Sequence, residues 1–126
     1  MNKYVSVYGT LRQGERANYM LDKCKFIGVS EEQLPFKMVN LGSYPALIPS
    51  DNNNKIVIET YKLPKDSQLI EDRLDMYEGY SEDGNGLYDK KLITLKSGIE
   101  SYIYYMKSEE KYYHGELIIS GNWLNR

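Results

Sequence analysis

Hydrophobic and polar positions alternate over short stretches along most of this chain, a pattern typical of β-strands separated by turns. The stretches are rich in Val, Ile, Tyr and Phe and are bounded by Gly, Pro, Asn and Asp, which favour turns. The predicted strands are residues 4–8, 26–29, 36–41, 55–63, 88–95 and 99–106. Turns are predicted at 42–45 and 51–54, and the Lys-Ser-Gly segment at 96–98 predicts a hairpin between the last two strands.

Two segments depart from this alternation and predict helices. Residues 15–22 form a short candidate. In the second, at about 67–78, Ile70, Leu74 and Tyr77 recur at the spacing of one helix face, and Gly79 is the expected terminator. Six strands and two short helices predict one mixed α+β fold, with closure of the sheet into a small barrel.

Length and charge narrow the classes of function. A chain of 126 residues corresponds to about one domain, so we expect a single domain over residues 1–126. The 16 Lys and Arg residues oppose 18 Asp and Glu residues, and a net charge of -2 provides no basic field for nucleic acid or an anionic membrane. No charge-free stretch is long enough to cross a membrane, and no apolar signal region follows the first residues. We expect a cytoplasmic protein with no nucleic-acid or membrane partner, and the oligomeric state stays open.

Cysteine and histidine usage argues against several cofactor chemistries. His114 is the only histidine and Cys24 the only cysteine, so a transition-metal site would have to be built mostly from carboxylates. Phosphate-binding loops, dinucleotide glycine patterns and a G-x-S-x-G elbow do not occur. We therefore expect neither metal nor cofactor. A nucleophilic pair of Cys24 and His114 is the alternative, without local support in the sequence.

The carboxylate of Glu78 has a distinctive position. It lies four residues after Leu74, between the apolar helix face and an acidic side made by Glu71 and Asp75. In the last helical turn a negative charge meets the unfavourable end of the helix dipole, and partial burial adds to this, so both effects raise the pKa of Glu78. Such a glutamate can act as a general base and then as a general acid near neutral pH. A solvated glutamate at the helix end is the alternative.

Tyrosine is unusually frequent, with 13 residues in the chain. Several of them, including Tyr102, Tyr104 and Tyr105, lie in the predicted late hairpin. Tyrosine suits strands because it combines an apolar body with a polar tip, so most of these residues need no further explanation. A pocket lined by phenol hydroxyls is the alternative interpretation.

Four short motifs occur in a fixed order along the chain. They are Y-G-T-L-R at residues 8–12, G-S-Y-P-A at 42–46, L-D-M-Y-E-G at 74–79 and Y-D-K at 88–90. Together they resemble the γ-glutamylcyclotransferase superfamily, in particular its short AIG2-like and γ-glutamylamine cyclotransferase-like members, over about residues 3–106. Two positions depart from the family pattern, since Ile58 precedes the glutamate of the middle strand and Lys90 replaces a frequent arginine.

The resemblance implies a small mixed, mostly antiparallel β-barrel flanked by short helices. It also implies cofactor-free release of 5-oxoproline from a γ-glutamyl amine or γ-glutamyl amino acid, with Glu78 as the catalytic acid/base. The implied substrate-binding residues are Tyr8, Gly9, Thr10, Leu11, Tyr44 and Tyr88. A non-catalytic small-molecule-binding protein of the same fold is the first alternative. An OB-like barrel that stacks single-stranded nucleic acid on its tyrosines is the second.

The chemistry of such a cyclisation is consistent with these residues. The α-amine of the substrate attacks its own side-chain carbonyl, so the enzyme needs an acid/base and hydrogen-bond donors rather than its own nucleophile. Gly9 at a strand end, with an expected positive φ, would let the N–H groups of residues 9–11 turn toward one anion. On the leaving-group side the sequence offers only Arg12 and Lys90 as charged clamps. We therefore expect tolerance there, with γ-glutamyl amines such as γ-glutamyl-ε-lysine favoured by the resemblance.

Overall fold

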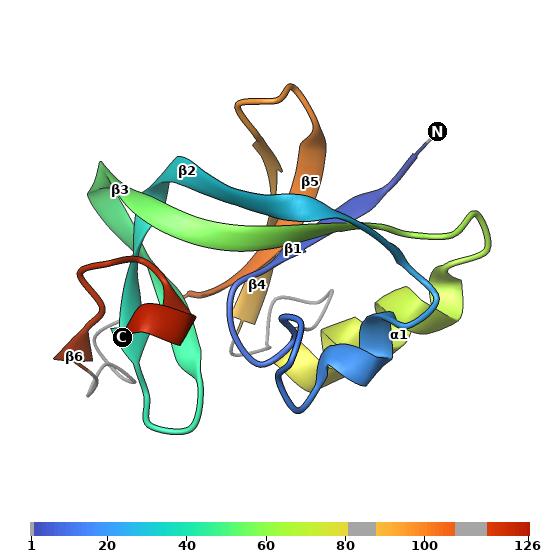
Figure 1. The fold of residues 1–126 in the computed structure, drawn as a ribbon, viewed down its shortest axis with the longest axis horizontal. Coiled ribbons are helices and arrows are strands. Elements are labelled where there is room, and N and C mark those ends of the chain that lie inside the picture. Colours follow the sequence, from blue (N-terminus) through green and yellow to red (C-terminus); the bar gives the residue numbers. More distant parts are fainter. Residues whose placement is uncertain (1, 81–87, 108–115) are drawn as a thin grey trace.

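The computed structural model describes residues 2–80, 88–107 and 116–126, in which one curled sheet packs against one α-helix (Figure 1). Its strands are β1 (Tyr4–Val7), β2 (Lys25–Asn40), β3 (Pro45–Lys62), β4 (Tyr88–Thr94), β5 (Glu100–Met106) and β6 (Glu116–Leu117). The helices are α1 (Gln68–Glu78) and two 3-10 helices, η1 (Asn18–Leu21) and η2 (Trp123–Asn125). His114 lies outside the described residues.

The strands form a mixed, mostly antiparallel sheet in the order β4-β5-β1-β3-β2-β6. Strand β1 is antiparallel to β3 and parallel to β5, and the other pairs are antiparallel. The sheet curls into a half-barrel, with α1 and η1 side by side below it (Figure 1). The α+β fold class predicted from the sequence is thereby confirmed.

Both faces of the sheet contribute buried side chains to the core, because successive side chains of a strand point to opposite sides. Val39 and Ile48 belong to a hydrophobic cluster that includes Leu74 of α1. Their neighbours Met38 and Leu47 belong to a second cluster, which includes the tryptophan of η2. The helices α1 and η1 therefore cover one face, and the C-terminal segment covers part of the other.

Helix α1 has the predicted bounds. It starts after Ser67, and it ends at Glu78 because Gly79 takes the left-handed conformation, with φ of 75°. The buried Leu74 anchors the helix to the sheet. Because the helix ends at Gly79, Glu78 lies in its last turn, at the edge of the sheet.

Within the described segments, no helix has the length and apolar character needed to cross a membrane.

The predicted helix at 15–22 is present only in part, because its second half is the 3-10 helix η1 and its first half consists of turns. The N–H of Ala17 donates to the carbonyl of Thr10 at 2.9 Å. The side-chain amide of Asn18 donates to the carbonyl of Leu11 at 2.8 Å. A single short turn of α-helix is marginal on its own, so these hydrogen bonds to the preceding loop determine its conformation.

The predicted strands at 26–29 and 36–41 are one long strand, β2. Pro35 interrupts the alternation in the sequence, and it lies where the pairing register shifts, between Leu34 and Phe36. Proline has no N–H to donate, so the ladder skips this position and then continues.

The predicted turn at 51–54 is a bulge inside the continuous strand β3. Leu34 pairs with Asn54 and Phe36 pairs with Pro49, so β3 carries extra residues opposite this part of β2. The side-chain amide of Asn54 donates to the carbonyl of Phe36 at 3.0 Å and stabilises the bulge. The predicted hairpin between β4 and β5 is confirmed.

The C-terminal segment packs closely along β3 at a position that requires a glycine. Gly121 has φ of 66°, and a Cβ built on it would lie 1.8 Å from the carbonyl oxygen of Lys55. Its own carbonyl accepts the N–H of Val57 at 2.7 Å. Trp123 follows, 2% exposed, and its indole N–H donates to the carboxylate of Glu15 at 3.1 Å. The last residues of the chain therefore belong to the fold and brace the loop after β1.

Candidate functional site

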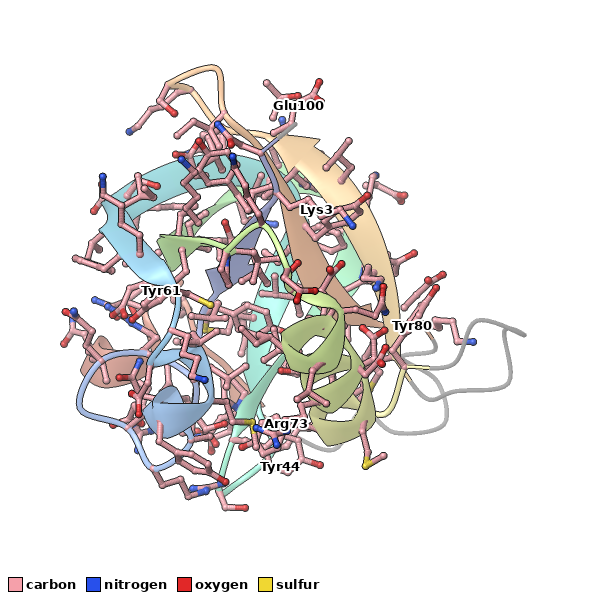
Figure 2. All side chains as sticks on the ribbon, turned by 90° about the vertical axis from the view of Figure 1, so that its right-hand side faces the viewer. Lys3, Tyr44, Tyr61, Arg73, Tyr80 and Glu100 are labelled. Atoms are coloured by element: carbon pink, nitrogen blue, oxygen red, sulfur yellow. The ribbon has the colours of Figure 1, made fainter. Side chains whose placement is uncertain are left out.

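A cavity of about 410 Å³ lies between the loop after β1, the end of α1 and strands β4 and β5. The residues that the resemblance implied for catalysis and substrate binding all line this cavity, although they come from distant parts of the chain. They are Tyr8, Gly9, Thr10, Leu11, Tyr44, Glu78 and Tyr88. In Figure 2 α1 faces the viewer, with Tyr80 just beyond its end and Tyr44 below it, at the turn between β2 and β3.

Glu78 is the only acidic residue that lines this cavity within the described part of the chain. It is partly buried, and burial raises the pKa of its carboxyl group from 4.5 to about 7. Among the described residues, the Glu78 carboxylate makes no hydrogen bond or ion pair. A carboxyl group with this pKa is present in both its ionised and its neutral form near neutral pH, as a group that accepts and returns a proton must be.

The loop after β1 lines the cavity and has backbone donors that are unpaired within the described residues. Its turn is closed by the N–H of Arg12, which donates to the carbonyl of Gly9 at 3.0 Å. Within the described residues, the N–H groups of Gly9, Thr10 and Leu11 donate no hydrogen bond. These residues are buried and line the cavity, and unpaired N–H groups of consecutive residues are able to bind an anion.

Gly9 is required for a different reason from the one expected. Its φ is not positive, which corrects the prediction from the sequence. A Cβ on Gly9 would instead lie 2.6 Å from Cγ and 2.7 Å from Cδ of Pro45, closer than real contacts allow. The glycine lets the loop approach the start of β3, and this close approach forms one wall of the cavity.

We expect Gly9→Ala to lower the free energy of unfolding by about 1–3 kcal/mol, the usual range for overpacking a buried site. The Pro45→Ala change removes the two ring atoms that the new methyl group would meet. The double variant should therefore lose less stability than the sum of the single changes, as measured by urea denaturation. Strict additivity of the two changes would contradict the assigned contact.

Tyr8 and Tyr88 differ in how their hydroxyl groups are used. The hydroxyl of Tyr8 donates to the carbonyl of Tyr104 at 2.9 Å and accepts the N–H of Leu47 at 3.4 Å, so it belongs to the frame of the site. The hydroxyl of Tyr88 has no hydrogen bond within the described residues. Burial raises the pKa of both phenols, and the nearby charge of Glu78 raises it further. Within the described residues, Tyr88 therefore offers an unpaired phenol near the charge of Glu78.

Sequence reasoning missed two further tyrosines of the site. Tyr77 was expected to face the core, but it lines the cavity, and its hydroxyl shares a hydrogen bond of 2.7 Å with the Thr10 hydroxyl. Tyr104 also lines the cavity and donates to the carboxylate of Asp75 at 2.5 Å. The only signal for Tyr104 was the local crowding of tyrosines, which did not distinguish it from its neighbours.

The two cations expected near the leaving group are both occupied elsewhere. Arg12 is buried and donates through Nε to Glu59 at 2.6 Å. Lys90 pairs with Asp75 at 3.0 Å. The cation that does line the cavity is Arg16, which the sequence placed in a predicted helix and did not single out.

No group of three His, Cys, Asp or Glu side chains that could hold a metal ion occurs in the described segments. Cys24 is partly buried, does not line the cavity, and burial raises the pKa of its thiol. The described polar groups that line the cavity are one carboxyl group, the hydroxyls of tyrosine, serine and threonine, backbone groups and one guanidinium.

Comparison with known proteins gives a consistent result. Residues 5–125 match the family model described as "Gamma-glutamyl cyclotransferase, AIG2-like", which extends the similarity beyond the motifs to nearly the whole chain. A protein of Halalkalibacterium halodurans named "Putative gamma-glutamylcyclotransferase BH1612" is 36% identical over 83 residues, covering 65% of this chain and 71% of that protein. A Vibrio cholerae protein with the same name, without the suffix, is 27% identical over 126 residues, covering 100% of this chain and 99% of that protein.

A solved structure supports the fold. The crystal structure of an AIG2-like protein from Mus musculus superimposes with a TM-score of 0.68 at 19% identity, covering 92% of this chain and 85% of that chain. At this identity the likeness concerns the fold alone.

Proposed function

The chain belongs to the γ-glutamyl cyclotransferase, AIG2-like family, and on this premise we propose that it cyclises a γ-glutamyl amine or γ-glutamyl amino acid, releasing 5-oxoproline and the free amine. The names of its relatives support an enzyme of this type acting on a small molecule. The observation that carries the proposal is the presence of Glu78, with a pKa of about 7, in one cavity with the unpaired N–H groups of residues 9–11.

Substrate binding follows from the charges of a γ-glutamyl group. Its α-carboxylate would accept hydrogen bonds from the N–H groups of Gly9, Thr10 and Leu11, which favours the anion in a buried site. The α-ammonium would then face the carboxylate of Glu78, with the free phenol of Tyr88 as a further hydrogen-bonding partner. Holding both ends of the amino acid brings its amine close to its own side-chain carbonyl, which supplies the proximity that ring closure needs.

The reaction moves two protons from the α-ammonium to the departing nitrogen, and one group can carry both in turn. Ionised Glu78 takes a proton from the α-ammonium, and the resulting amine attacks the γ-carbonyl carbon to form a carbon–nitrogen bond in a five-membered ring. Neutral Glu78 then gives this proton to the departing nitrogen as the bond from the γ-carbonyl carbon to the leaving amine breaks. The ring nitrogen still carries one proton too many, and the regenerated carboxylate of Glu78 takes this proton and passes it to the released amine. The products are 5-oxoproline and the protonated amine, and Glu78 is again ionised.

A pure binding protein of this fold would have little use for Glu78. Burying a carboxylate disfavours its charged form and lowers stability above its pKa, which a protein tolerates where the group has a function. A solvated glutamate at the end of α1 would bind water and keep its ordinary pKa. The raised pKa of Glu78 therefore favours catalysis over passive binding.

The proposal is tested by following 5-oxoproline with mass spectrometry during incubation with γ-glutamyl-alanine, γ-glutamyl-ε-lysine, glutathione and α-glutamyl-alanine, with and without EDTA. We expect product from at least one γ-glutamyl compound and none from the α-glutamyl isomer, whose amine is not positioned to displace that leaving group. EDTA should have no effect. Absence of product from every γ-glutamyl compound, in protein shown to be folded, would leave the binding function as the better explanation.

A further inference from the structure

The cavity has a buried floor and an exposed rim. On the floor, Leu11 is 2% exposed and Tyr88 is 6% exposed. On the rim, Tyr44 is 41% exposed, Met76 is 83% exposed, and Arg16 is also exposed. The γ-glutamyl group is the same small unit in every substrate. It suits the floor, where the backbone N–H donors of residues 9–11 lie. The leaving group differs in size between substrates and has room only at the rim.

Arg16 is the cation of this rim. Among the described residues that line the cavity, it is the only Lys or Arg, and it makes no ion pair or hydrogen bond with the described part of the chain. Its backbone is held in place, because the next residue, Ala17, donates its N–H to the carbonyl of Thr10 at 2.9 Å. The backbone of Arg16 is therefore fixed beside the loop after β1, while the donors of its guanidinium are unused within the described residues.

We propose that Arg16 binds a carboxylate on the leaving group, so that the preferred substrates are γ-glutamyl conjugates of amino acids with a free carboxylate rather than conjugates of neutral amines. The inference rests on the proposed cyclisation. A guanidinium matches a carboxylate through two parallel hydrogen bonds, and a neutral carboxamide does not reproduce that match. The other carboxylate of the substrate, the α-carboxylate of the γ-glutamyl group, is bound separately by the N–H groups of residues 9–11. This replaces the tolerance expected from the sequence, which considered only Arg12 and Lys90.

The test compares γ-glutamyl-alanine with γ-glutamyl-alaninamide, two substrates that differ only in the charge of the leaving group. The wild-type protein should show about a tenfold higher kcat/KM for the alanine conjugate, the effect of one charge-assisted contact. Arg16→Ala should remove this preference by lowering kcat/KM for the alanine conjugate, while the value for the amide stays within about twofold. Arg73→Ala is the matched control, because Arg73 lies exposed on α1 outside the cavity lining, and this variant should keep the preference.

Each other result has a definite meaning. An equal loss for both substrates in Arg16→Ala would overturn the proposal and assign Arg16 to the γ-glutamyl group or to the structure of the loop. A wild-type protein that releases 5-oxoproline equally from both substrates would overturn it while leaving the cyclisation intact. Release from neither substrate, nor from any other γ-glutamyl compound, would instead remove the proposed function itself.

Discussion

Glu78→Gln is expected to lower kcat for 5-oxoproline release by about a hundredfold or more, with little change in KM. One positioned acid/base contributes about 10²–10⁴ in rate, and an amide of the same shape can neither accept nor return the proton. The matched control is Glu71→Gln, since Glu71 lies on the same helix but outside the cavity lining. That variant should retain the wild-type kcat, and a Glu78→Gln protein that is folded and fully active would refute the assigned role.

The pKa of Glu78 gives this variant a second readout. Because the carboxyl must be ionised to act as a base, wild-type kcat/KM should rise with pH up to about 7, and Glu78→Gln should lose this rise. The effect on stability has the opposite sign. A pKa raised from 4.5 in the unfolded chain to about 7 in the folded protein means that stability is lost as pH rises through this interval. Thermal unfolding should therefore show Glu78→Gln to be more stable than wild type at pH 8 and about equal to it at pH 4.

Glu78 could be located from the sequence because the relevant signals are local. The helix face, its glycine terminator and the position of the glutamate in the last turn all lie within a few residues of one another, and local patterns of this kind fix helix ends well. The direction of its pKa was predicted for two reasons, burial and the helix dipole, and burial is the cause that the structure supports. The ordered motifs supplied the rest of the candidate site.

The features that the sequence did not reveal depend on contacts between distant residues. The requirement for Gly9 arises from Pro45, in another strand, and no local pattern carries it. Arg16 was assigned to a helix because its neighbours allow one, whereas hydrogen bonds to the preceding loop decide the conformation. Strand β2 was divided at Pro35, and the first part of β3 was not predicted because the polar bulge after it resembles a turn in composition although pairing continues.

Arg12 shows most clearly that contacts between distant residues decide a role that the sequence alone does not reveal. Its charge suggested a contact with substrate, whereas its position gives it a structural role. Its Nε donates to Glu59 at 2.6 Å, and its Nη1 donates to Asn122 at 2.7 Å. The second oxygen of Glu59 accepts the N–H of Gln13 at 2.8 Å. The pair thus holds the loop after β1 against β3 and the C-terminal segment. Its side chains are 5% and 3% exposed, so neither charge has water as a substitute partner.

Glu59→Gln should therefore lower the free energy of unfolding by about 3–5 kcal/mol, because it leaves the guanidinium of Arg12 buried without its counter-charge. Urea denaturation at neutral pH measures the change. The matched control is Glu31→Gln, whose partner Lys55 lies 4.0 Å away in an exposed pair, and it should lose less than about 1 kcal/mol. In the double variant Arg12→Met/Glu59→Gln no charge is stranded, so it should be more stable than the sum of its single changes predicts. If the two changes were additive, the loop would be held by its other contacts, and the buried pair would not be what fixes the N–H groups of residues 9–11 in the cavity.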